Sequence, residues 1–310
     1  MASTRVAVII NPISGTGGRL HVARERAELA ASLIAGRGYD SQVFITERPG
    51  HGRELAAAAL AQGASLVIAW GGDGTVNEVG SALAFRDATL GIVPSGTGNG
   101  LAGELRIPFD PVSALDVALR GRERRIDAGE LDGRLFFNVA GIGLDARVAH
   151  RFAAGGLVHR GFRRYLAITV SELFTYKPDY HTIVTDGHTL QARTLLIAIA
   201  NSPQYGNGAL IAPEARLDDG RLDVVVVAAR SPLAALVQVP RMFSGRIAAV
   251  PGVTMSSAVD IQVTSGQPVL YHVDGEPYTG AAVVAARPWP AALRVVVPVD
   301  ARPPHRTKQT

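Results

Sequence analysis

Short apolar runs alternate with helix-like segments over the first part of the chain. Runs of strand length mark the expected strands, and apolar residues recurring with a period near 3.6 mark the expected helices. The expected strands are Arg5–Ile10, Ser41–Thr46, Ser65–Trp70 and Thr89–Val93. The expected helices are Gly18–Ala35, Gly52–Gln62, Thr75–Phe85, Asn99–Leu105 and Pro111–Arg120. This alternation predicts a parallel sheet covered by helices, with a ligand site at the carboxyl ends of its strands.

After Gly121 the pattern changes to β-branched runs separated by turn dipeptides, which predicts hairpins. These dipeptides are Asp132-Gly133, Asp186-Gly187, Asp219-Gly220 and Asp274-Gly275. The expected fold class is therefore α/β plus β: a parallel-sheet domain over residues 1–121, then a mostly antiparallel, β-sandwich-like domain over residues 122–300. We expect a helical insertion at 143–176 in the second domain and a flexible tail at 301–310.

Composition narrows the possible chemistry. The 310 residues are 47% hydrophobic and 19% charged, which excludes a wholly disordered chain and a coiled coil. The chain has no cysteine, so disulfides, iron–sulfur clusters and a thiol nucleophile are excluded. No apolar stretch reaches the roughly 18 residues of a membrane span, and we expect a cytoplasmic protein. The net charge is only +4, but all except two of the 31 basic residues are arginine, which suits anionic partners.

Glycine-rich turns follow three of the expected strands. Residues 11–18, Asn-Pro-Ile-Ser-Gly-Thr-Gly-Gly, offer backbone amides and a helix N-terminus to an anion, although an ordinary strand-to-helix connection reads the same way. The turn Gly71–Thr75, Gly-Gly-Asp-Gly-Thr, is more specific, because Asp73 would repel a phosphate unless a metal ion lies between them or the carboxylate handles a proton. Both roles belong to phosphoryl transfer, and a structural Asx turn is the alternative.

The third turn, residues 94–102, places Gly98, Gly100 and Gly103 in a G-x-G-x-x-G spacing. A dinucleotide site is not expected, because that fingerprint belongs to the first strand–helix unit, and this match lies in the fourth. The chain has no G-x-x-x-x-G-K-[ST] sequence, so a Walker A loop is excluded.

Together these turns resemble the diacylglycerol kinase catalytic family, which includes bacterial soluble lipid kinases and the sphingosine and ceramide kinases. The matching turns are Asn-Pro-x-Ser-Gly, Gly-Gly-Asp-Gly-Thr and Gly-Thr-Gly-Asn, in that order after the first, third and fourth strands. The resemblance continues through Arg125–Asp127, Phe137–Asp145, Leu217–Leu222 and Asp274–Glu276. It implies a fold like that of the NAD kinases and diacylglycerol kinases.

The resemblance also implies a role for each matched residue. ATP would bind at Asn11, Ser14, Gly71, Gly72, Asp73, Gly74, Thr75, Thr97, Gly98 and Asn99. Glu276 resembles the family's general base, and Asp73 and Asp127 resemble further catalytic acids. Asp219 resembles a ligand of a structural Mg²⁺, although a second acidic ligand found in some members would fall on Arg216. The implied activity is transfer of the γ-phosphate of ATP to the hydroxyl of a membrane lipid such as a diacylglycerol, a sphingoid base or a ceramide.

The resemblance is incomplete at one position, and two other functions compete with it. Many bacterial members have Asn-Asp where this chain has Asn99-Gly100, so the lipid is not identified. One alternative is a kinase of a soluble acceptor, because NAD kinases share the Gly-Gly-Asp-Gly turn. The other is a non-catalytic nucleotide or lipid sensor.

The chain contains one segment suited to a membrane surface. Residues 146–171 have no acid, and Arg147, Arg151, Arg160, Arg163 and Arg164 alternate with apolar side chains. We expect peripheral contact with the inner face of a membrane there, the alternative being a solvated amphipathic helix. A homodimer is also left open, whereas no nucleic-acid partner is expected because the chain has no recognised nucleic-acid module.

Overall fold

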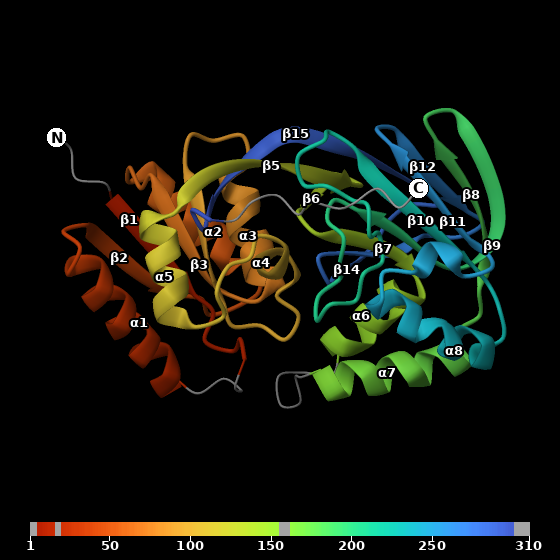
Figure 1. Cartoon of the computed structure of the whole chain (residues 1–310), viewed down its shortest axis with the longest axis horizontal. Helices are drawn as coiled ribbons and strands as arrows, with labels where there is room; N and C mark the ends of the chain where they lie inside the picture. The colour runs from red at the N-terminus through yellow and green to blue at the C-terminus, as the bar shows by residue number, and fades with distance from the viewer. Residues whose placement is uncertain (1–4, 16–19, 155–161, 301–310) are drawn as a thin grey trace.

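A computed structural model describes residues 5–15, 20–154 and 162–300 of the chain. Two sequence expectations lie outside these residues: the membrane contact of Arg160 and the flexible tail 301–310. In Figure 1 the N-terminal α/β half and the C-terminal β-rich half lie side by side, and two long strands pass from one to the other. These strands are β5 (Arg122–Leu131) and β15 (Val283–Val297).

The N-terminal half is a parallel sheet with helices on it. Its strands are β1 (Arg5–Ile10), β2 (Asp40–Ile45), β3 (Leu66–Gly71) and β4 (Thr89–Pro94). Its helices are α1 (Leu20–Ala35), α2 (His51–Ala61), α3 (Asp73–Leu83), α4 (Gly100–Glu104) and α5 (Pro111–Arg120). Each element lies within a few residues of the expected position.

The strand order β2-β1-β3-β4 positions the ligand site. From β1 the chain goes outward to β2 and then crosses back to β3, so connections leave β1 and β3 in opposite directions. Such a switch point opens a crevice at the carboxyl ends of the strands. Val6–Ile10 and Val67–Trp70 are almost fully buried, because helices cover both faces of a doubly wound parallel sheet.

The C-terminal half is largely antiparallel. Its further strands are β6 (Arg134–Phe136), β7 (Val139–Gly143), β8 (Asp179–Thr185), β9 (His188–Ala200), β10 (Leu222–Ala228), β11 (Val253–Ala258), β12 (Ile261–Ser265), β13 (Leu270–Val273) and β14 (Glu276–Thr279). Its helices are α6 (Leu144–Ala154), α7 (Phe162–Thr175) and α8 (Pro232–Phe243), with a 3₁₀ turn at Ile247–Ala249. The first two form the expected insertion; α8 is an addition that the sequence reading did not anticipate.

Strand β15 joins the two halves. Its first part pairs with β12, and its last part pairs in parallel with β4 and antiparallel with β5. Leu293, Val295 and Val297 are therefore buried in the core of the N-terminal sheet. A register shift between Trp289 and Leu293 bends the strand where it passes between the halves.

Candidate active site

The three glycine-rich turns meet at the carboxyl edge of the parallel sheet. The Ser95 amide donates to the Gly71 carbonyl at 2.8 Å, which joins the turn after β4 to the one after β3. Ser14 and Ser95 share a hydroxyl–hydroxyl hydrogen bond of 2.7 Å. The Asn11 side-chain amide donates to the Thr75 hydroxyl at 3.0 Å. Residues from three separate turns therefore line one site at the carboxyl ends of the strands, where the sequence predicts a ligand.

Two of these turns approach so closely that only glycine fits at the contact. A Cβ on Gly96 would lie 2.5 Å from the Gly72 Cα, and one on Gly72 would lie 3.0 Å from the Gly96 Cα. Asn99 closes the Gly96 turn from the other side: its Oδ1 accepts from the Gly96 amide and its Nδ2 donates to the Gly96 carbonyl, both at 2.8 Å. Helix α3 starts directly after Gly72, so its free backbone amides lie at this contact. The result is a cradle of backbone amides, with Thr97 exposed at its rim.

Arg26 of α1 is a site residue that the sequence reading missed. Its guanidinium donates to the Ser14 hydroxyl and the Ser14 carbonyl, both at 3.2 Å. It also lies over the ring of Trp70, 5.9 Å from the centroid. Burial lowers the pKa of Arg26 from its ordinary value, but an arginine remains charged. A permanently charged side chain therefore holds the first turn in place. Nothing in the sequence motifs distinguishes Arg26 from Arg24, the other arginine of α1.

Asp73 is the first residue of α3 and faces the third turn. A Cβ on Gly98 would lie 2.9 Å from the Asp73 Oδ2 atom. Burial and then the negative charge of Asp274 raise the pKa of Asp73 to about 6, against a lowering by hydrogen bonds from the backbone amides of Leu101, Gly100 and Asn99. A carboxyl group with such a pKa can exchange a proton near neutral pH.

Asp274 connects the two halves around this site. Its carboxylate accepts from the Asn77 side chain of α3 at 2.8 Å. It also accepts three backbone amides, those of Phe137 and Asn138 at 2.9 Å and that of Val139 at 3.1 Å. Burial raises the pKa of Asp274. The sequence predicts Asp274 as part of a hairpin turn and of a family motif, but not as a link between the two halves.

Glu276 comes directly after the two-residue hairpin turn Asp274-Gly275. Asp274 and Gly275 both have positive φ, 47° and 87°, which is the type I′ geometry that Asp-Gly favours. Glu276 then starts β14 with its side chain exposed, and its carboxylate reaches the second glycine turn. A Cβ on Gly74 would lie 3.0 Å from the Glu276 Oε1 atom. A carboxylate of the second half thus lies beside Gly74, the neighbour of Asp73 in the first half.

A hydrogen-bonded set of side chains, His272, Asp145 and Tyr205, supports this hairpin. His272 Nδ1 accepts from the Gly275 amide at 3.3 Å, so its ring proton is on Nε2, which lies 3.4 Å from the Asp145 Oδ2 atom. The Tyr205 hydroxyl donates to the same carboxylate oxygen at 2.7 Å. A side chain at Gly141 would overlap both Asp145 and His272, so this glycine leaves the room in which they meet. The group fixes the tautomer of His272 and, through Gly275, the turn that carries Glu276.

The structure places Asp127 on β5 with both carboxylate oxygens occupied by backbone amides. Oδ1 accepts from Ala291 and Oδ2 from Gly220, each at 2.7 Å. Asp127 is buried, and its own amide donates to the Leu217 carbonyl at 2.6 Å. These bonds hold the Asp219-Gly220 turn and the bend of β15, where Ala291 has a φ of 52°. The catalytic role of Asp127 stays a prediction.

Asp219 lies on an exposed turn and accepts from the Arg221 amide at 3.1 Å. Arg216 occupies the position of the second acidic ligand and pairs with Asp218 at 3.4 Å. Within residues 5–15, 20–154 and 162–300, no three histidine or carboxylate side chains gather closely enough to hold a metal ion. The metal-binding role of Asp219 therefore also stays a prediction.

Comparisons with known proteins cover almost the whole chain. The family model for the diacylglycerol kinase catalytic domain matches residues 5–131, and that for the YegS C-terminal, NAD kinase β-sandwich-like domain matches residues 138–297. A protein of Mycobacterium tuberculosis (strain H37Rv) named "Diacylglycerol kinase" is 31% identical over 301 residues, 95% of each chain. A "Probable lipid kinase YegS-like" protein of Klebsiella pneumoniae (strain 342) is 31% identical over 276 residues, 87% of this chain and 91% of that one.

Comparison with solved structures finds the same fold in diacylglycerol kinases. A crystal structure described as a diacylglycerol kinase from Bacillus anthracis matches with a TM-score of 0.70 and 20% identity, covering 96% of this chain and 98% of that one. The expected fold class is thereby confirmed: a parallel-strand catalytic domain followed by a β-sandwich-like domain. With both family models matched in order and relatives aligned along most of the sequence, the chain belongs to the diacylglycerol kinase catalytic family of kinases.

Proposed function

We propose that this kinase transfers the γ-phosphate of ATP to the hydroxyl of a membrane lipid, such as a diacylglycerol, a sphingoid base or a ceramide. The observation that carries the proposal is the meeting of Glu276 with Gly74, beside Asp73 and directly over the start of α3. The nearby amide cradle suits a polyphosphate and the exposed carboxylate suits a hydroxyl, so the two reactants would meet between the two halves. The names of the relatives support a lipid acceptor.

The nucleotide would be held by backbone groups. Gly71–Thr75 and Thr97–Asn99 present amides and hydroxyls at the helix N-terminus, where an anion is stabilised. Asn11 and Ser14 form the facing wall, and Arg26 adds a positive charge next to Ser14. The glycine contacts support this assignment, because side chains at Gly72 or Gly96 would push apart the two turns whose amides form the cradle.

Magnesium fits the same place. Mg²⁺ is commonly held by one or two carboxylates together with substrate phosphates, and Asp73 is a carboxylate at the cradle. When bound, the ion would neutralise charge on the transferred phosphoryl group. Asp219 is a separate candidate for a structural Mg²⁺, with backbone carbonyls supplying further ligands.

Glu276 is proposed as the general base. Its carboxylate takes the proton of the lipid hydroxyl as the hydroxyl oxygen forms a bond to the γ-phosphorus, and the bond between that phosphorus and the bridging oxygen of ADP breaks. The products are the phosphorylated lipid, ADP and one proton, which leaves Glu276 to solvent. Such base catalysis contributes roughly 10²- to 10⁴-fold. Asp127 is proposed to act through positioning, since its carboxylate already holds two backbone amides.

No helix in the described part of the chain is long and apolar enough to cross a membrane. We propose a cytoplasmic enzyme that reaches its lipid by peripheral contact with the inner face of the membrane. The acceptor's hydroxyl would have to reach Glu276, which is exposed at the start of β14.

Labelled ATP incubated with separate diacylglycerol, ceramide, sphingoid base, undecaprenol and NAD samples tests the proposal. We expect a labelled lipid with the wild type and roughly 10²- to 10⁴-fold slower labelling with Glu276→Gln, whereas Glu28→Gln, which changes an exposed carboxylate of α1, should retain full activity. Label in the NAD sample alone would establish the soluble-acceptor alternative. ATP binding without transfer to any acceptor would establish the sensor.

A further inference from the structure

Helices α7 and α8 lie together on the underside of the C-terminal half, next to α6 (Figure 1). They share a small apolar cluster with the strands above them. Its buried members are Leu144, Val148, Leu173 and Leu195, and Ile168 of α7 and Ala235 of α8 pack against it. The inner sides of α7 and α8 thus pack against the same apolar cluster.

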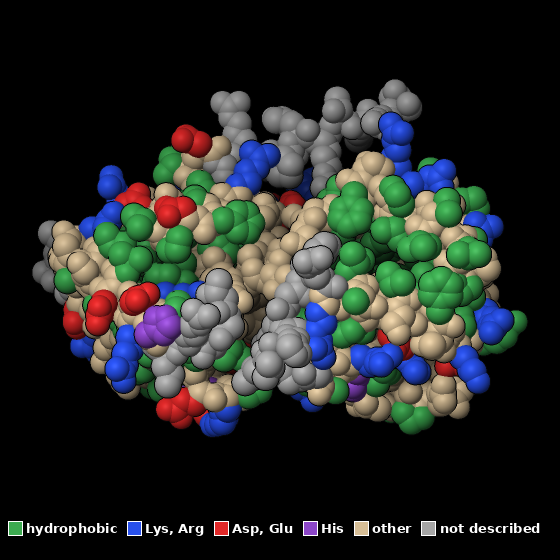
Figure 2. Space-filling model, turned by 90° about the horizontal axis from the view of Figure 1, so that it is seen from below, with side chains coloured by type: hydrophobic (Ala, Val, Ile, Leu, Met, Phe, Trp, Pro, Cys, Tyr) green, Lys and Arg blue, Asp and Glu red, His purple; other side chains and the backbone are tan. Residues whose placement is uncertain are grey.

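The outer sides of the same helices are apolar and exposed. Helix α8 has no buried residue. The most exposed of their large side chains are Val237 (71%), Leu233 (67%), Phe174 (53%), Phe243 (49%) and Leu166 (48%). Figure 2 looks at this underside and shows hydrophobic side chains gathered over the C-terminal half, with lysine or arginine side chains around them. Contiguous exposed apolar surface of this kind marks an interaction site.

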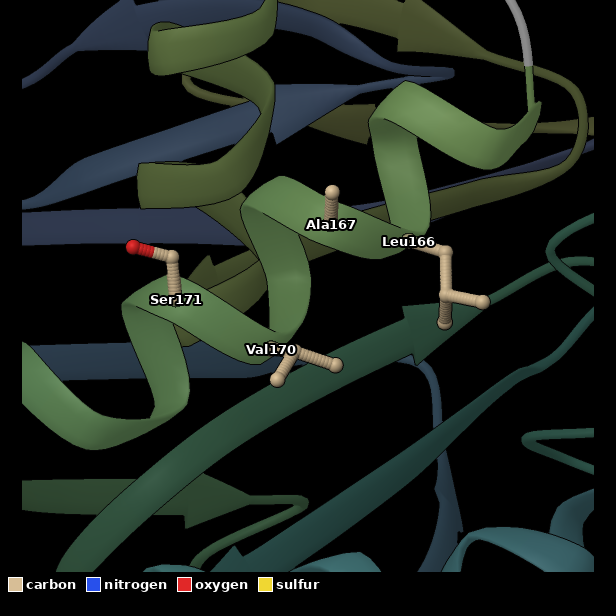
Figure 3. Close-up of a pocket in the computed structure, with 4 residues that line it drawn as sticks. All are labelled: Leu166, Ala167, Val170 and Ser171. Atoms are coloured by element: carbon tan, nitrogen blue, oxygen red, sulfur yellow. The ribbon is translucent and has the colours of Figure 1, made fainter.

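Helix α7 also borders a hollow in this surface. Leu166, Ala167, Val170 and Ser171 line an open cavity of about 550 Å³. Leu166 and Val170 lie one helical turn apart on the same side of α7 (Figure 3). Three of the four side chains that line this open hollow are apolar, so it continues the exposed apolar surface of the two helices.

The charges of this face have one sign. Residues 146–171 and 224–259 are both free of aspartate and glutamate, and the fold brings parts of these two segments side by side. Arg230, Arg241 and Arg246 are exposed around α8. The sequence analysis identified only residues 146–171 as a basic, acid-free segment. The fold places part of residues 224–259 beside it.

One acid beside the first segment is already neutralised. Glu172 of α7 is fully buried and pairs with Arg147 and Arg151 of α6. Two of the arginines that the sequence assigned to membrane contact are therefore paired with a buried acid of the same chain, although their own side chains are about half exposed. Because the trio still carries one net positive charge, it leaves the sign of the face unchanged.

We propose that the outer face of α7 and α8 docks on the surface of a bilayer containing anionic lipids, an inference that rests on the proposed lipid kinase function. Leu166, Leu233 and Val237 would enter the boundary between headgroups and acyl chains, while the arginines contact headgroup phosphates. A second copy of the chain fits less well, because a symmetric contact would oppose two acid-free basic faces. The bilayer offers both the negative charge and the apolar layer that this face matches.

Docking in this orientation would link the membrane to the catalytic centre through one helix. Helix α6 packs against α7 and carries Asp145 in its first turn. Asp145 in turn contacts His272 and Tyr205 behind the Glu276 hairpin. The face that touches lipid is thus separated from the hairpin by a single layer of packed elements.

Sedimentation with vesicles tests the face without any enzymatic turnover. We expect the wild type to bind vesicles of phosphatidylcholine with phosphatidylglycerol more tightly than vesicles of phosphatidylcholine alone. Val237→Glu, Leu166→Glu and Arg241→Glu should each weaken binding to the anionic vesicles roughly tenfold. Phe109→Glu and Arg86→Glu are matched controls, because they change exposed residues of the N-terminal half and should bind as the wild type does.

Unchanged vesicle binding in Val237→Glu and Leu166→Glu would overturn the proposal. A dimer seen without vesicles by analytical ultracentrifugation, and dissociated by Val237→Glu, would assign the face to a second copy and overturn it as well. The kinase proposal fails separately. Vesicle binding that is lost in these variants, combined with no transfer to any lipid, would leave the face standing and refute the function. If the protein phosphorylates a short-chain dispersed lipid, but none of these substitutions weakens vesicle binding, the kinase function stands and the docking face is refuted.

Discussion

Glu276 and Gly74 belong to different halves of the chain, yet the Glu276 Oε1 atom would lie 3.0 Å from a Cβ placed on that glycine. The side chain of the proposed base is thus held against the backbone of the turn after β3. This contact needs the hairpin of β13 and β14 and the start of α3 to be positioned together. A substitution that adds one methyl group at Gly74 therefore tests whether the two halves are positioned as described.

Gly74→Ala should displace the Glu276 carboxylate while leaving the fold intact. Gly74 has no positive φ, so the new methyl group acts through space and not through backbone strain. We expect kcat for lipid phosphorylation to fall roughly 10- to 100-fold, the size expected when a reacting group is misplaced by about 1 Å. Gly266→Ala is the control, since a Cβ there would meet nothing within 4 Å. Equal kcat values for the two variants would contradict the contact.

Glu276→Gln should remove the base while retaining its shape. We expect kcat to fall by roughly 10²- to 10⁴-fold with little change in the KM for ATP, because the nucleotide is held by the glycine turns of the other half. Steady-state kinetics with varied ATP separate the two constants. A rise in the KM for ATP at unchanged kcat would assign Glu276 to nucleotide binding.

His272→Asn and His272→Gln should differ, because each retains one end of the imidazole. The Asn oxygen can replace Nδ1 as the acceptor for the Gly275 amide, whereas the Gln amide can replace Nε2 opposite Asp145. If the bond to Gly275 holds the Glu276 turn, His272→Asn should retain most of the wild-type kcat, and His272→Gln should lose roughly tenfold. Both should keep the KM for ATP. The reverse order would show that the contact with Asp145 is the important one.

Asp73→Asn should inactivate the enzyme and stabilise it at alkaline pH. The pKa of Asp73 is raised from 3.8 to about 6, so the folded protein holds this proton more tightly than the unfolded chain does. The stabilising contribution is complete below pH 3.8 and is lost as the pH rises through about 6. At pH 8 the variant should therefore exceed the wild type in free energy of unfolding by on the order of 3 kcal/mol. Urea unfolding at pH 4 and pH 8 measures the difference.

Near pH 4 the difference between the two proteins should shrink to a small part of that at pH 8, since the folded-state carboxyl is then almost fully protonated and the unfolded-state carboxyl about half protonated. Asp260→Asn, at an exposed position, controls for a general effect of removing one negative charge. If the variant were more stable than the wild type by the same amount at both pH values, ionisation of Asp73 would not be what destabilises the folded protein.

The sequence predicted the N-terminal half well because its signals are local. Apolar strands, helical periodicity and the glycine turns each act within a few residues, and the doubly wound order explains why three distant turns, such as those at Ser14 and Ser95, converge. The family resemblance supplied Glu276, which turn chemistry alone would have assigned to an ordinary hairpin.

Long-range partners could not be predicted in the same way. Arg26 lies in the middle of a helix with nothing to distinguish it, and Asp274 gains its role from amides more than 130 positions away. Helix α8 was missed because its apolar run, read as sequence, equally suits a buried element. The ion pairs of Glu172 were missed because the acid-free window ends at the residue before it.

The path of β15 has a consequence for how the protein is made. Strand β4 carries the third glycine turn at its end, and its second neighbour in the sheet is β15, at Arg294 and Val295. On the ribosome, that edge of β4 has no partner until every other described strand has been synthesised. The nucleotide half therefore cannot complete its own sheet as an early folding unit, and truncation before Arg294 should disable a site whose glycine turns all lie within the first third of the chain.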